Sequence, residues 1–462
     1  MTMLRYLVSA VVLGHATGCQ VSPNKTGKAK RPPNFILIYA DDLGYGDLGC
    51  FGSKKNRTPN IDKMAAEGMR LTSFYSTSGV CTPSRSSLMT GCYPRRVNMH
   101  VDADGRWVLF PNARKGLHPD EVTVAEVLKD RGYRTACIGK WHLGDQLQFL
   151  PTRQGFDSYF GIPYSNDMNR KGIPLPLMRD EKVIEAPVSQ PTLTKRYTAA
   201  AVEFIARNRG HPFFLYLPHT FPHLPLFASR DFKGRSANGR YGDAIEEIDW
   251  STGQILAALK QHGLDDDTLV IFTSDNGSNG RNGGSNAPLR GRKGTTHEGG
   301  MREPCIVRWP GRVPAGKTCD EVTSTIDILP TFAELAGSRP PMDRTIDGKD
   351  IWPLLAGAEG VKSPHAAFYY YRLAELQAVR AGNWKLIFPR KQRNRKLQLS
   401  LIDLDADIHE DTNRVEQHPD VVARLTKLAD LARSELGDGK RPGTGQRPAG
   451  MVEKATPRLL SK

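Results

Sequence analysis

Short apolar runs alternate with segments of helical hydrophobic spacing over the first three quarters of the chain. Five runs have the length and composition of buried strands: residues 34–40, 134–139, 212–217, 268–274 and 304–309. Between them, Thr123 and Glu126 form a capping box that begins a short helix. Apolar residues from Ile245 to Leu259 keep helical spacing up to a stop at Gly263. This alternation predicts an α/β domain over residues 34–340, with a mostly parallel sheet flanked by helices.

The pattern changes after the Pro-rich segment at residues 339–341. Strand-like runs without helices between them cover residues 367–372, 376–389 and 399–404. A helical segment follows over about 419–436. Runs at hairpin spacing predict a small antiparallel sheet, so we expect a C-terminal α+β domain over residues 341–436. Residues 437–462 are rich in Gly, Pro and basic residues, and we expect a disordered tail there.

The N-terminal segment has the features of a secretion signal. Arg5 precedes an apolar run at residues 7–13, which is far too short to span a bilayer. Small residues directly before Cys19 resemble a bacterial lipobox, so residues 1–19 are expected to be a signal peptide. Cys19 would then carry a lipid that tethers the protein to a membrane, with residues 20–33 as a linker; a plain secretion signal is the alternative. We therefore expect an exported bacterial protein, located in the periplasm, at the outer membrane or outside the cell.

The composition excludes several classes of protein. Of 462 residues, 39% are hydrophobic and 24% charged, which does not fit a disordered, collagen-like or coiled-coil chain. The net charge of +15 would attract polyanions such as sulfated glycans, anionic membranes or nucleic acid, but charge alone does not choose among them. Seven cysteines leave at least one unpaired. Cys305 and Cys319 flank a Pro/Gly-rich turn and are candidates for a disulfide, which export favours.

Ionisable or metal-coordinating side chains follow four of the five predicted strands. They are Asp41 and Asp42, Lys140 and His142, His219 and His223, and Asp275 and Asn276. Each pair alone is most simply a turn former. Four strands that bring such groups to one edge of a sheet, however, indicate a ligand site. Three carboxylates and an amide oxygen suit Ca²⁺ or Mg²⁺ better than zinc. Cationic side chains around them suit group transfer from a tetrahedral oxyanion ester.

A candidate nucleophile lies at residues 81–85, Cys-Thr-Pro-Ser-Arg. Pro83 is tolerated in a first helical turn, so the N–H groups that open this helix can face an anion. As a bare residue, Cys81 is equally well explained as a buried apolar side chain or half of a disulfide.

The segment Cys-x-Pro-x-Arg, followed by Ser-x-x-Thr-Gly at residues 87–91, resembles the hallmark of the formylglycine-dependent sulfatases. Five further motifs match that family in order and spacing: Asp-Asp-Leu-Gly-Tyr-Gly (41–46), Gly-Lys-Trp-His-Leu-Gly (139–144), Gln-Gly-Phe-Asp (154–157), Thr-Ser-Asp-Asn-Gly (273–277) and Gly-Thr-Thr-His-Glu-Gly-Gly (294–300). The likeness extends from Asn34 to about residue 430. It includes Gly-Ile-Pro-Tyr-Ser at residues 161–165, which the arylsulfatase A and N-acetylgalactosamine-6-sulfatase kinds share. The resemblance implies an alkaline-phosphatase-like fold with a smaller C-terminal domain.

The resemblance also implies how Cys81 acts. A dedicated formylglycine-generating enzyme would oxidise it to Cα-formylglycine, whose hydrated aldehyde attacks sulfur and then expels sulfate as the aldehyde re-forms. An ordinary serine would remain trapped as a stable sulfate ester. The family match assigns the ligands of a Ca²⁺ ion to Asp41, Asp42, Cys81, Asp275 and Asn276.

The same match assigns further roles. Arg85 would steady the hydrated aldehyde, because its planar fork suits that task. Lys140 and Lys293 would neutralise the sulfate oxygens. His142 would take a proton when the aldehyde re-forms, and His223, alone or with Lys293, would protonate the leaving alcohol. Ser165 matches a serine that contacts sulfate.

Several positions have a plain structural alternative. His297 is about equally a substrate contact or part of a packed wall, and His219 more often satisfies a backbone group than touches substrate. Asn166 occupies a position where arylsulfatase A has a histidine, which puts a ring contact there in doubt. Arg372, His365 and a basic segment at residues 390–396 are candidates to meet a sugar.

Three functions fit these observations. The first is an exported sulfatase that releases inorganic sulfate from a sulfated carbohydrate or an aryl sulfate, with no nucleic-acid partner. The second is a phosphatase or phosphodiesterase of the alkaline phosphatase superfamily, but those relatives use Ser or Thr and usually two zinc ions. The third is a non-catalytic protein that binds sulfated glycans, which is less expected because every matched catalytic position is filled.

Overall fold

The large sheet has the mixed, mostly parallel topology that the sequence predicts. The computed structural model describes residues 31–169, 172–392 and 395–460; the predicted signal peptide, Cys19 and most of the predicted linker lie outside these ranges. The strand order is β11-β2-β10-β9-β1-β8-β4-β5-β6-β7, with β12 paired to β2. The strands are β1 Asn34–Ala40, β2 Met69–Tyr75, β4 Arg134–Ile138, β5 Ser158–Gly161, β6 Leu177–Arg179, β7 Lys182–Glu185, β8 Phe213–Pro218, β9 Thr268–Ser274, β10 Arg302–Arg308, β11 Lys317–Cys319 and β12 Thr323–Ser324.

Strand β1 lies at the centre of this sheet and separates two cores. It pairs in parallel with β8 and β9, and all seven of its residues are buried. Its side chains alternate between the two faces. Phe35, Leu37 and Tyr39 belong to one hydrophobic cluster, and Ile36 and Ile38 belong to the other. A strand covered on both faces reads as a continuous apolar run, which is why β1 could be predicted.

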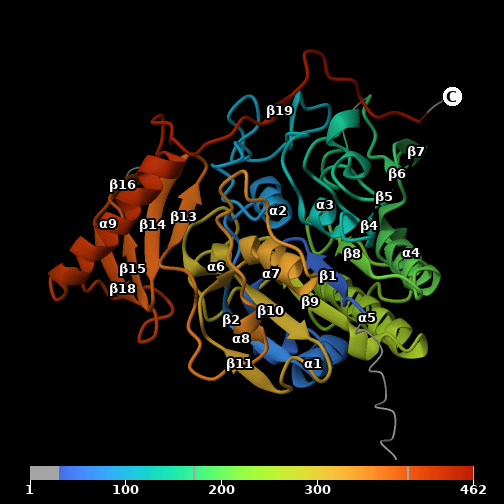
Figure 1. Cartoon of the computed structure of the whole chain (residues 1–462), viewed down its shortest axis with the longest axis horizontal. Helices are drawn as coiled ribbons and strands as arrows, with labels where there is room; N and C mark the ends of the chain where they lie inside the picture. Colours follow the sequence, from blue (N-terminus) through green and yellow to red (C-terminus); the bar gives the residue numbers. More distant parts are fainter. Residues whose placement is uncertain (1–30, 170–171, 393–394, 461–462) are drawn as a thin grey trace, which may run out of the picture. The chain divides into compact units, whose positions relative to one another are not determined.

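Helices cover both faces of the sheet (Figure 1). The Phe35 cluster includes residues of α2 Cys81–Thr90, α3 Val124–Lys129 and α7 Ile328–Leu335. The Ile36 cluster includes residues of α1 Pro59–Ala66, α4 Leu193–Arg207 and α5 Gly239–Gln261. The predicted capping box begins α3, because the Thr123 side chain accepts from the Glu126 N–H and Glu126 accepts from the Thr123 N–H. No helix in the described ranges combines the length and the apolar character needed to cross a bilayer.

The predicted C-terminal sheet is confirmed as an antiparallel sheet closed by one helix. It consists of β13 Phe368–Arg372, β14 Glu375–Ala381, β15 Trp384–Ile387, β18 Ser400–Asp403 and the helix α9 Pro419–Leu436. Smaller elements are β3 Lys115–Gly116, α6 Glu298–Met301, α8 Trp352–Leu355, β16 Arg390–Gln392, β17 Arg395–Leu397 and β19 Gly450–Met451. The hydrophobic cluster of the C-terminal sheet and α9 also includes Tyr75 and Met301, which lie in the region of the large sheet. Pro32–Lys462 accordingly forms one compact unit.

Two expectations differ from the structure. The tail predicted as disordered is placed against the large sheet region up to residue 460: β19 pairs with β3, and Arg447 forms an ion pair with Glu121. Its composition could not show this, because the partners lie more than 300 positions away in the sequence. Cys305 and Cys319 do not form a disulfide, and all six cysteines in the described ranges are free.

Candidate active site

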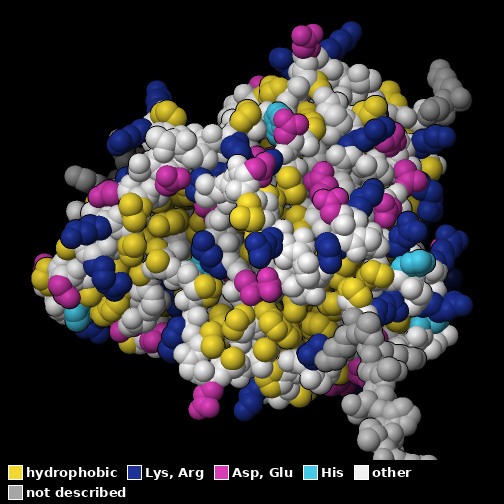
Figure 2. Space-filling model, viewed as in Figure 1, with side chains coloured by type: hydrophobic (Ala, Val, Ile, Leu, Met, Phe, Trp, Pro, Cys, Tyr) yellow, Lys and Arg dark blue, Asp and Glu magenta, His cyan; other side chains and the backbone are white. Residues whose placement is uncertain are grey.

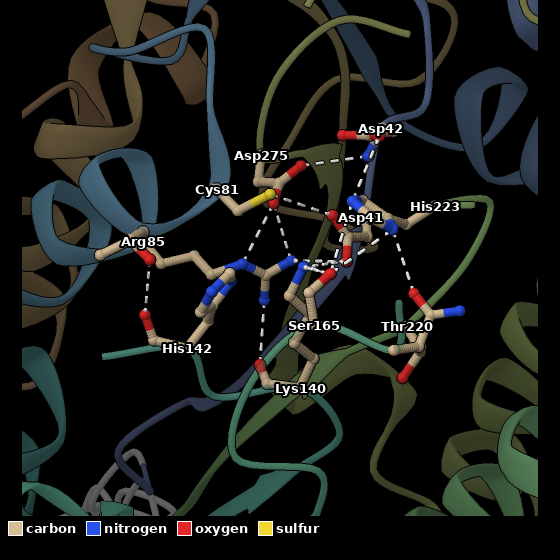
Figure 3. Close-up of polar contacts among 12 residues, drawn as sticks. Asp41, Asp42, Cys81, Arg85, Lys140, His142, Ser165, Thr220, His223 and Asp275 are labelled. Atoms are coloured by element: carbon tan, nitrogen blue, oxygen red, sulfur yellow. Dashed lines mark hydrogen bonds and ion pairs between the residues drawn. The ribbon is translucent and has the colours of Figure 1, made fainter. Parts of the chain in front are cut away.

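Most of the polar residues predicted at the strand ends meet in one buried cluster (Figure 3), and His219 is the exception. Asp41 and Asp42 directly follow β1, and Asp275 directly follows β9. These strands are adjacent and parallel, so their carboxyl ends lie at the same edge. The Asp42 N–H donates to Asp275 Oδ1 at 3.1 Å. The prediction that these three carboxylates converge is therefore confirmed.

Cys81 begins α2 and lies against this acidic cluster. Its side chain is buried, with Sγ 3.6 Å from Asp41 Oδ1 and 3.6 Å from Lys293 Nζ. The residue before it, Val80, provides no side-chain cap, so the first N–H groups of the helix are available to an anion. Burial, only partly offset by Lys140 and Lys293, raises the pKa of the Cys81 thiol to about 12. An unmodified thiol here would stay protonated near neutral pH and would be a weak nucleophile.

Three cationic side chains surround Cys81 and the carboxylates. Arg85 donates through Nε and Nη2 to Asp275 Oδ2, at 3.1 and 2.8 Å, and through Nη1 to the Lys140 carbonyl at 2.9 Å. Lys140 Nζ bonds to Asp41 Oδ2 at 2.5 Å and to Ser165 Oγ at 3.2 Å. Lys293 Nζ lies 2.6 Å from Asp42 Oδ1. Burial alone would raise the pKa of Asp41. The nearby side chains of Lys140, His223 and Arg85 instead hold this pKa below its usual range.

The acidic residues and Asn276 fit a divalent cation. Asn276 Oδ1 is buried and has no hydrogen-bond partner in the described part of the chain, while its Nδ2 donates to Asp42 Oδ1 at 2.7 Å. Ligand atoms of Asp41, Asp42, Cys81 and His223 lie within 4.8 Å of one another. A buried set dominated by carboxylate and amide oxygens is suited to a hard cation. Asp275 borders the same set, but its two oxygens already accept bonds from Arg85 and the Asp42 N–H.

Two histidines border the cluster, and they make different hydrogen-bond contacts. His223 Nε2 lies 3.8 Å from Asp42 Oδ2, and Nδ1 lies 3.0 Å from Asn166 Oδ1. His142 Nε2 lies 2.9 Å from the Leu109 carbonyl. A carbonyl only accepts, so Nε2 of His142 carries the hydrogen and Nδ1 keeps a lone pair. Burial, followed by the charge of Lys140, holds the pKa of His142 well below its usual value, and burial with Lys293 lowers that of His223.

His219 and His297 lie in different surroundings. His219 is buried with Nε2 3.4 Å from Ser251 Oγ on α5, which is a structural contact. His297 has Nδ1 3.4 Å from Glu410 Oε2 and is partly exposed, and its role in substrate binding stays a prediction.

One position was not assigned from the sequence. Asn166 is fully buried and contacts His223 through Oδ1, while its Nδ2 donates to Gln190 Oε1 and to the Pro225 carbonyl, both at 3.0 Å. These bonds fix the amide and with it the ring of His223. Two signals were present in the sequence, its position directly after Ser165 and the histidine that arylsulfatase A has at the matching position. The partners of Asn166 become visible only in the fold.

Comparisons with known proteins agree with this geometry. The Sulfatase family model matches residues 33–338, and the model "N-sulphoglucosamine sulphohydrolase, C-terminal" matches residues 292–434. Human arylsulfatase A is 42% identical over 389 residues, which cover 78% of this chain and 75% of that protein. The N-acetylgalactosamine-6-sulfatase of Canis lupus familiaris is 43% identical over 380 residues, covering 78% of this chain and 72% of that protein.

Solved structures extend the likeness to the whole fold. The crystal structure of Ps i-CgsB in complex with k-i-k-neocarrahexaose superposes with a TM-score of 0.76 at 31% identity, covering 87% of this chain and 92% of that chain. The mixed sheet and its antiparallel C-terminal companion are alkaline-phosphatase-like, as expected. The chain belongs to the sulfatase family and is a hydrolase of sulfate esters.

Proposed function

We propose that this enzyme is an exported sulfatase that releases inorganic sulfate from a sulfated carbohydrate, with Cys81 converted to Cα-formylglycine and with Ca²⁺ as its metal. The observation that carries the proposal is the position of Cys81 at the start of α2, with Sγ 3.6 Å from both Asp41 and Lys293. The name of the N-acetylgalactosamine-6-sulfatase relatives and the oligosaccharide in the Ps i-CgsB complex support a carbohydrate substrate.

The surroundings of Cys81 support the modification and the metal. A buried, protonated thiol is poorly suited to attack sulfur, whereas the hydrated aldehyde supplies an oxygen nucleophile and expels sulfate as its carbonyl re-forms. Bound Ca²⁺ would supply charge that polarises a sulfate oxygen and lowers the pKa of the nucleophile. Asp41, Asp42, Asp275, Asn276 and the modified Cys81 would hold it.

The cationic residues would hold the sulfate. Lys140 and Lys293 flank Cys81 on two sides, so both can neutralise charge as it develops on the sulfate oxygens. Ser165 Oγ, 3.2 Å from Lys140 Nζ, can donate to the same group. Arg85 keeps Asp275 and the Lys140 backbone in place through its three hydrogen bonds.

The histidines would move the protons. His142 is neutral with an unprotonated Nδ1, which suits a base that accepts the proton released when the aldehyde re-forms. His223 lies between Asp42 and Ser165, which suits an acid for the leaving alcohol. His297 would contact the substrate from the rim of the site, where its side chain is partly exposed.

Export is proposed from the N-terminal sequence alone. The segment from Arg5 to Cys19 supports a secreted protein, in the periplasm or outside the cell, and Cys19 supports a lipid tether to the outer membrane. A formylglycine-generating enzyme would be needed as a partner during maturation.

Mass spectrometry of the peptide that contains Cys81, isolated from the native host, tests the proposal. We expect the mass loss of a thiol-to-aldehyde conversion at Cys81 and none at Cys92, a second buried cysteine outside the site. Cys81→Ala should keep the fold but lose more than about 10³-fold in turnover of sulfated substrates, as when other covalent nucleophiles are removed. Cys92→Ala should keep the turnover.

An unmodified thiol in active enzyme, or sulfate release by Cys81→Ala, would contradict the nucleophile assignment. Parallel assays with matched phosphate esters separate the alternative, because a phosphatase or phosphodiesterase would cleave them faster than the sulfate esters. Binding of sulfated glycans without any sulfate release would instead indicate a non-catalytic protein.

A further inference from the structure

An exposed tryptophan lies beside the segment that carries Lys293. Trp107 is 40% exposed, although most large hydrophobic side chains in the described ranges are buried. Its ring packs on Gly294 so closely that a Cβ there would come within 2.4 Å of ring atom Cζ3. Gly294 follows Lys293, whose Nζ lies 3.6 Å from Cys81 Sγ. The indole therefore lies at the border of the catalytic cluster without being part of it.

Arg372, the last residue of β13, holds this tryptophan from the C-terminal sheet. Its guanidinium carbon lies 4.5 Å from the centroid of the Trp107 ring, and its Nε donates to the Gly294 carbonyl at 3.0 Å. Within the described ranges, its two terminal nitrogens have no hydrogen-bond partner and no carboxylate is in ion-pair contact with it. One side of the guanidinium is thus fixed, and the other presents a free fork for an anion.

A second arginine with an unused donor begins strand β16 of the C-terminal part. Arg390 Nη1 is buried and has no hydrogen-bond partner among the described residues. Burial and then the charge of Arg372 lower the pKa of Arg390, although the carboxylates of Glu375 and Glu410 act in the opposite direction. Two guanidinium groups with unused donors repel each other unless an anion lies between or beside them. A bound anion would satisfy the buried Nη1 of Arg390 and offset the repulsion between the two groups.

We propose that Trp107, Arg372 and Arg390 form a subsite for the sugar residue next to the one that loses its sulfate, and that the two arginines bind an anionic group on that neighbour, a second sulfate or a carboxylate. This inference rests on the proposed carbohydrate-sulfatase function. A shallow hollow of about 10 Å³ is lined by Val80, which precedes Cys81, and by Trp107, Gly294 and Arg372. The neighbouring sugar would therefore lie across the mouth of this hollow, on the exposed face of Trp107, and not inside it.

The division of charges supports this arrangement. Lys140 and Lys293 form ion pairs with the carboxylates beside Cys81, so we assign them to binding the sulfate that is cleaved. Arg372 and Arg390 form no ion pair within the described ranges. Arg372 ends β13 of the C-terminal sheet, and Arg390 begins β16 of the neighbouring hairpin. The indole of Trp107 offers an apolar face to a sugar ring, and its ring N–H has no partner in the described part of the chain. The enzyme would thus prefer oligosaccharides with anionic groups on adjacent sugars.

Competition and turnover with small and extended probes test the subsite. The probes are 4-nitrophenyl sulfate, a chondroitin 6-sulfate tetrasaccharide, whose neighbouring sugars carry carboxylates, and a carrageenan tetrasaccharide, which carries sulfates only. Each saccharide is assayed as a substrate and as an inhibitor of 4-nitrophenyl sulfate turnover, so that binding is measured whether or not it is cleaved. The variants are Arg372→Gln, Arg390→Gln and Trp107→Ala, with Arg424→Gln on the exposed face of α9 as the matched control.

The comparison uses the saccharide that wild type binds better. Its inhibition constant or KM, divided by the KM for 4-nitrophenyl sulfate, is the ratio to be measured. We expect this ratio to rise at least tenfold in both arginine variants. The ratio should rise less in Trp107→Ala and stay constant in Arg424→Gln. The preferred tetrasaccharide identifies the anion as a carboxylate or a sulfate. Should Arg372→Gln unfold, Arg372→Lys, which keeps the charge without the fork, provides the same comparison.

Two failures are distinguishable. If saccharides are desulfated and the ratios do not change in the arginine variants, the subsite is wrong and the proposed function stands. If wild type cleaves 4-nitrophenyl sulfate but neither cleaves nor binds any saccharide, the carbohydrate function and the subsite are both wrong.

Discussion

At the scale of single residues, the active site departs from ordinary backbone geometry in two places. Asp42 and His142 both adopt the left-handed region, with φ of 66° and 63°. For residues other than glycine this costs roughly 1–3 kcal/mol each and persists only where neighbours impose it. The Asp42 N–H is held by Asp275, and the His142 N–H by the Pro163 carbonyl. The strain turns both side chains toward the cluster directly after their strands end.

Arg85 offers a sharp test of how the cluster is held together. Its three hydrogen bonds need the planar fork, and a lysine reaches only part of that set. We expect Arg85→Lys to lower kcat by about 10²-fold or more and the free energy of unfolding by about 1–3 kcal/mol. Steady-state kinetics and chemical denaturation measure the two effects.

Arg96→Lys is the matched control for that variant. Arg96 is also buried and holds Asp347 at 2.8 and 2.7 Å, away from the catalytic cluster. It should lose stability by a similar amount and keep kcat. Equal losses of kcat in the two variants would show that Arg85 acts only through stability.

The sequence predicted the residues of the site that follow the strands. It did not predict the groups that hold the two histidines in position. Asp41 and Asp275 follow long apolar runs, so the edge where they meet was predictable from local pattern alone. Asn166 and the Leu109 carbonyl hold His223 and His142 through contacts between distant segments. Nothing local marks a backbone carbonyl or a loop amide as a partner.

At the scale of elements, burial decided which strands were predictable. All residues of β1, β9 and β10 are buried, so they appear as continuous apolar runs. Strand β2 alternates between buried and partly buried positions, and β7 is largely open to solvent, so neither was predicted. The run at residues 376–389 is two strands, because Gly382 turns the chain with a positive φ of 61°.

The contact between His365 and Asp327 predicts a pH dependence of stability. His365 Nε2 lies 2.8 and 2.9 Å from the two oxygens of Asp327, which also accept the N–H groups of Ser324 and Lys349. Burial alone would lower the pKa of His365, but the Asp327 carboxylate raises it above the usual value of 6.5. The stabilisation is therefore fully present below about pH 6.5 and is lost as the pH rises through the folded-state pKa.

We expect His365→Gln to lower the free energy of unfolding by about 1–3 kcal/mol at pH 5.5, as for other hydrogen bonds to charged groups. The difference from wild type should shrink as the pH rises towards 9, because the wild-type histidine loses its proton as the pH passes its folded-state pKa. Chemical denaturation at both pH values measures it. A difference that does not depend on pH would mean that the charged form of His365 contributes nothing.

At the scale of the whole molecule, the net charge of +15 is not a single basic patch on the face in view. Figure 2 shows Lys and Arg side chains scattered among Asp and Glu over that face. Scattered charge raises the encounter rate with polyanions but does not select one. Selection then depends on individual arginines whose donors are not already used, such as Arg372 and Arg390.

A buried ionic cluster joins the catalytic part to the C-terminal sheet. Lys385 of β15 bonds to Glu298 Oε1 at 2.9 Å, to Glu410 Oε1 at 2.8 Å and to the Thr296 carbonyl at 2.8 Å, and all three charged side chains are fully buried. Burial would raise the pKa of Glu298, but Lys385, Arg302 and Arg380 hold it below its usual range. Glu298 begins α6, shortly after Lys293, so this cluster also fixes the segment that brings Lys293 to Cys81.

Lys385→Met keeps the length of the side chain and removes its charge, which leaves Glu298 and Glu410 buried close together without their shared cation. We expect the free energy of unfolding to fall by about 3–5 kcal/mol, as when one partner of a buried ion pair is removed. Turnover should fall as well, because the segment with Lys293 loses its anchor. Lys427→Met, at an exposed position of α9, should change neither.

The triple variant Glu298→Gln, Lys385→Met and Glu410→Gln separates charge from packing. If the loss in Lys385→Met comes from uncompensated carboxylates, neutralising both should restore part of the stability in chemical denaturation. If the triple variant is no more stable than Lys385→Met, the hydrogen bond to the Thr296 carbonyl and the packing of the lysine stem dominate instead. Recovery of stability without recovery of turnover would show that the ionic cluster positions Lys293, rather than only holding the two sheets together.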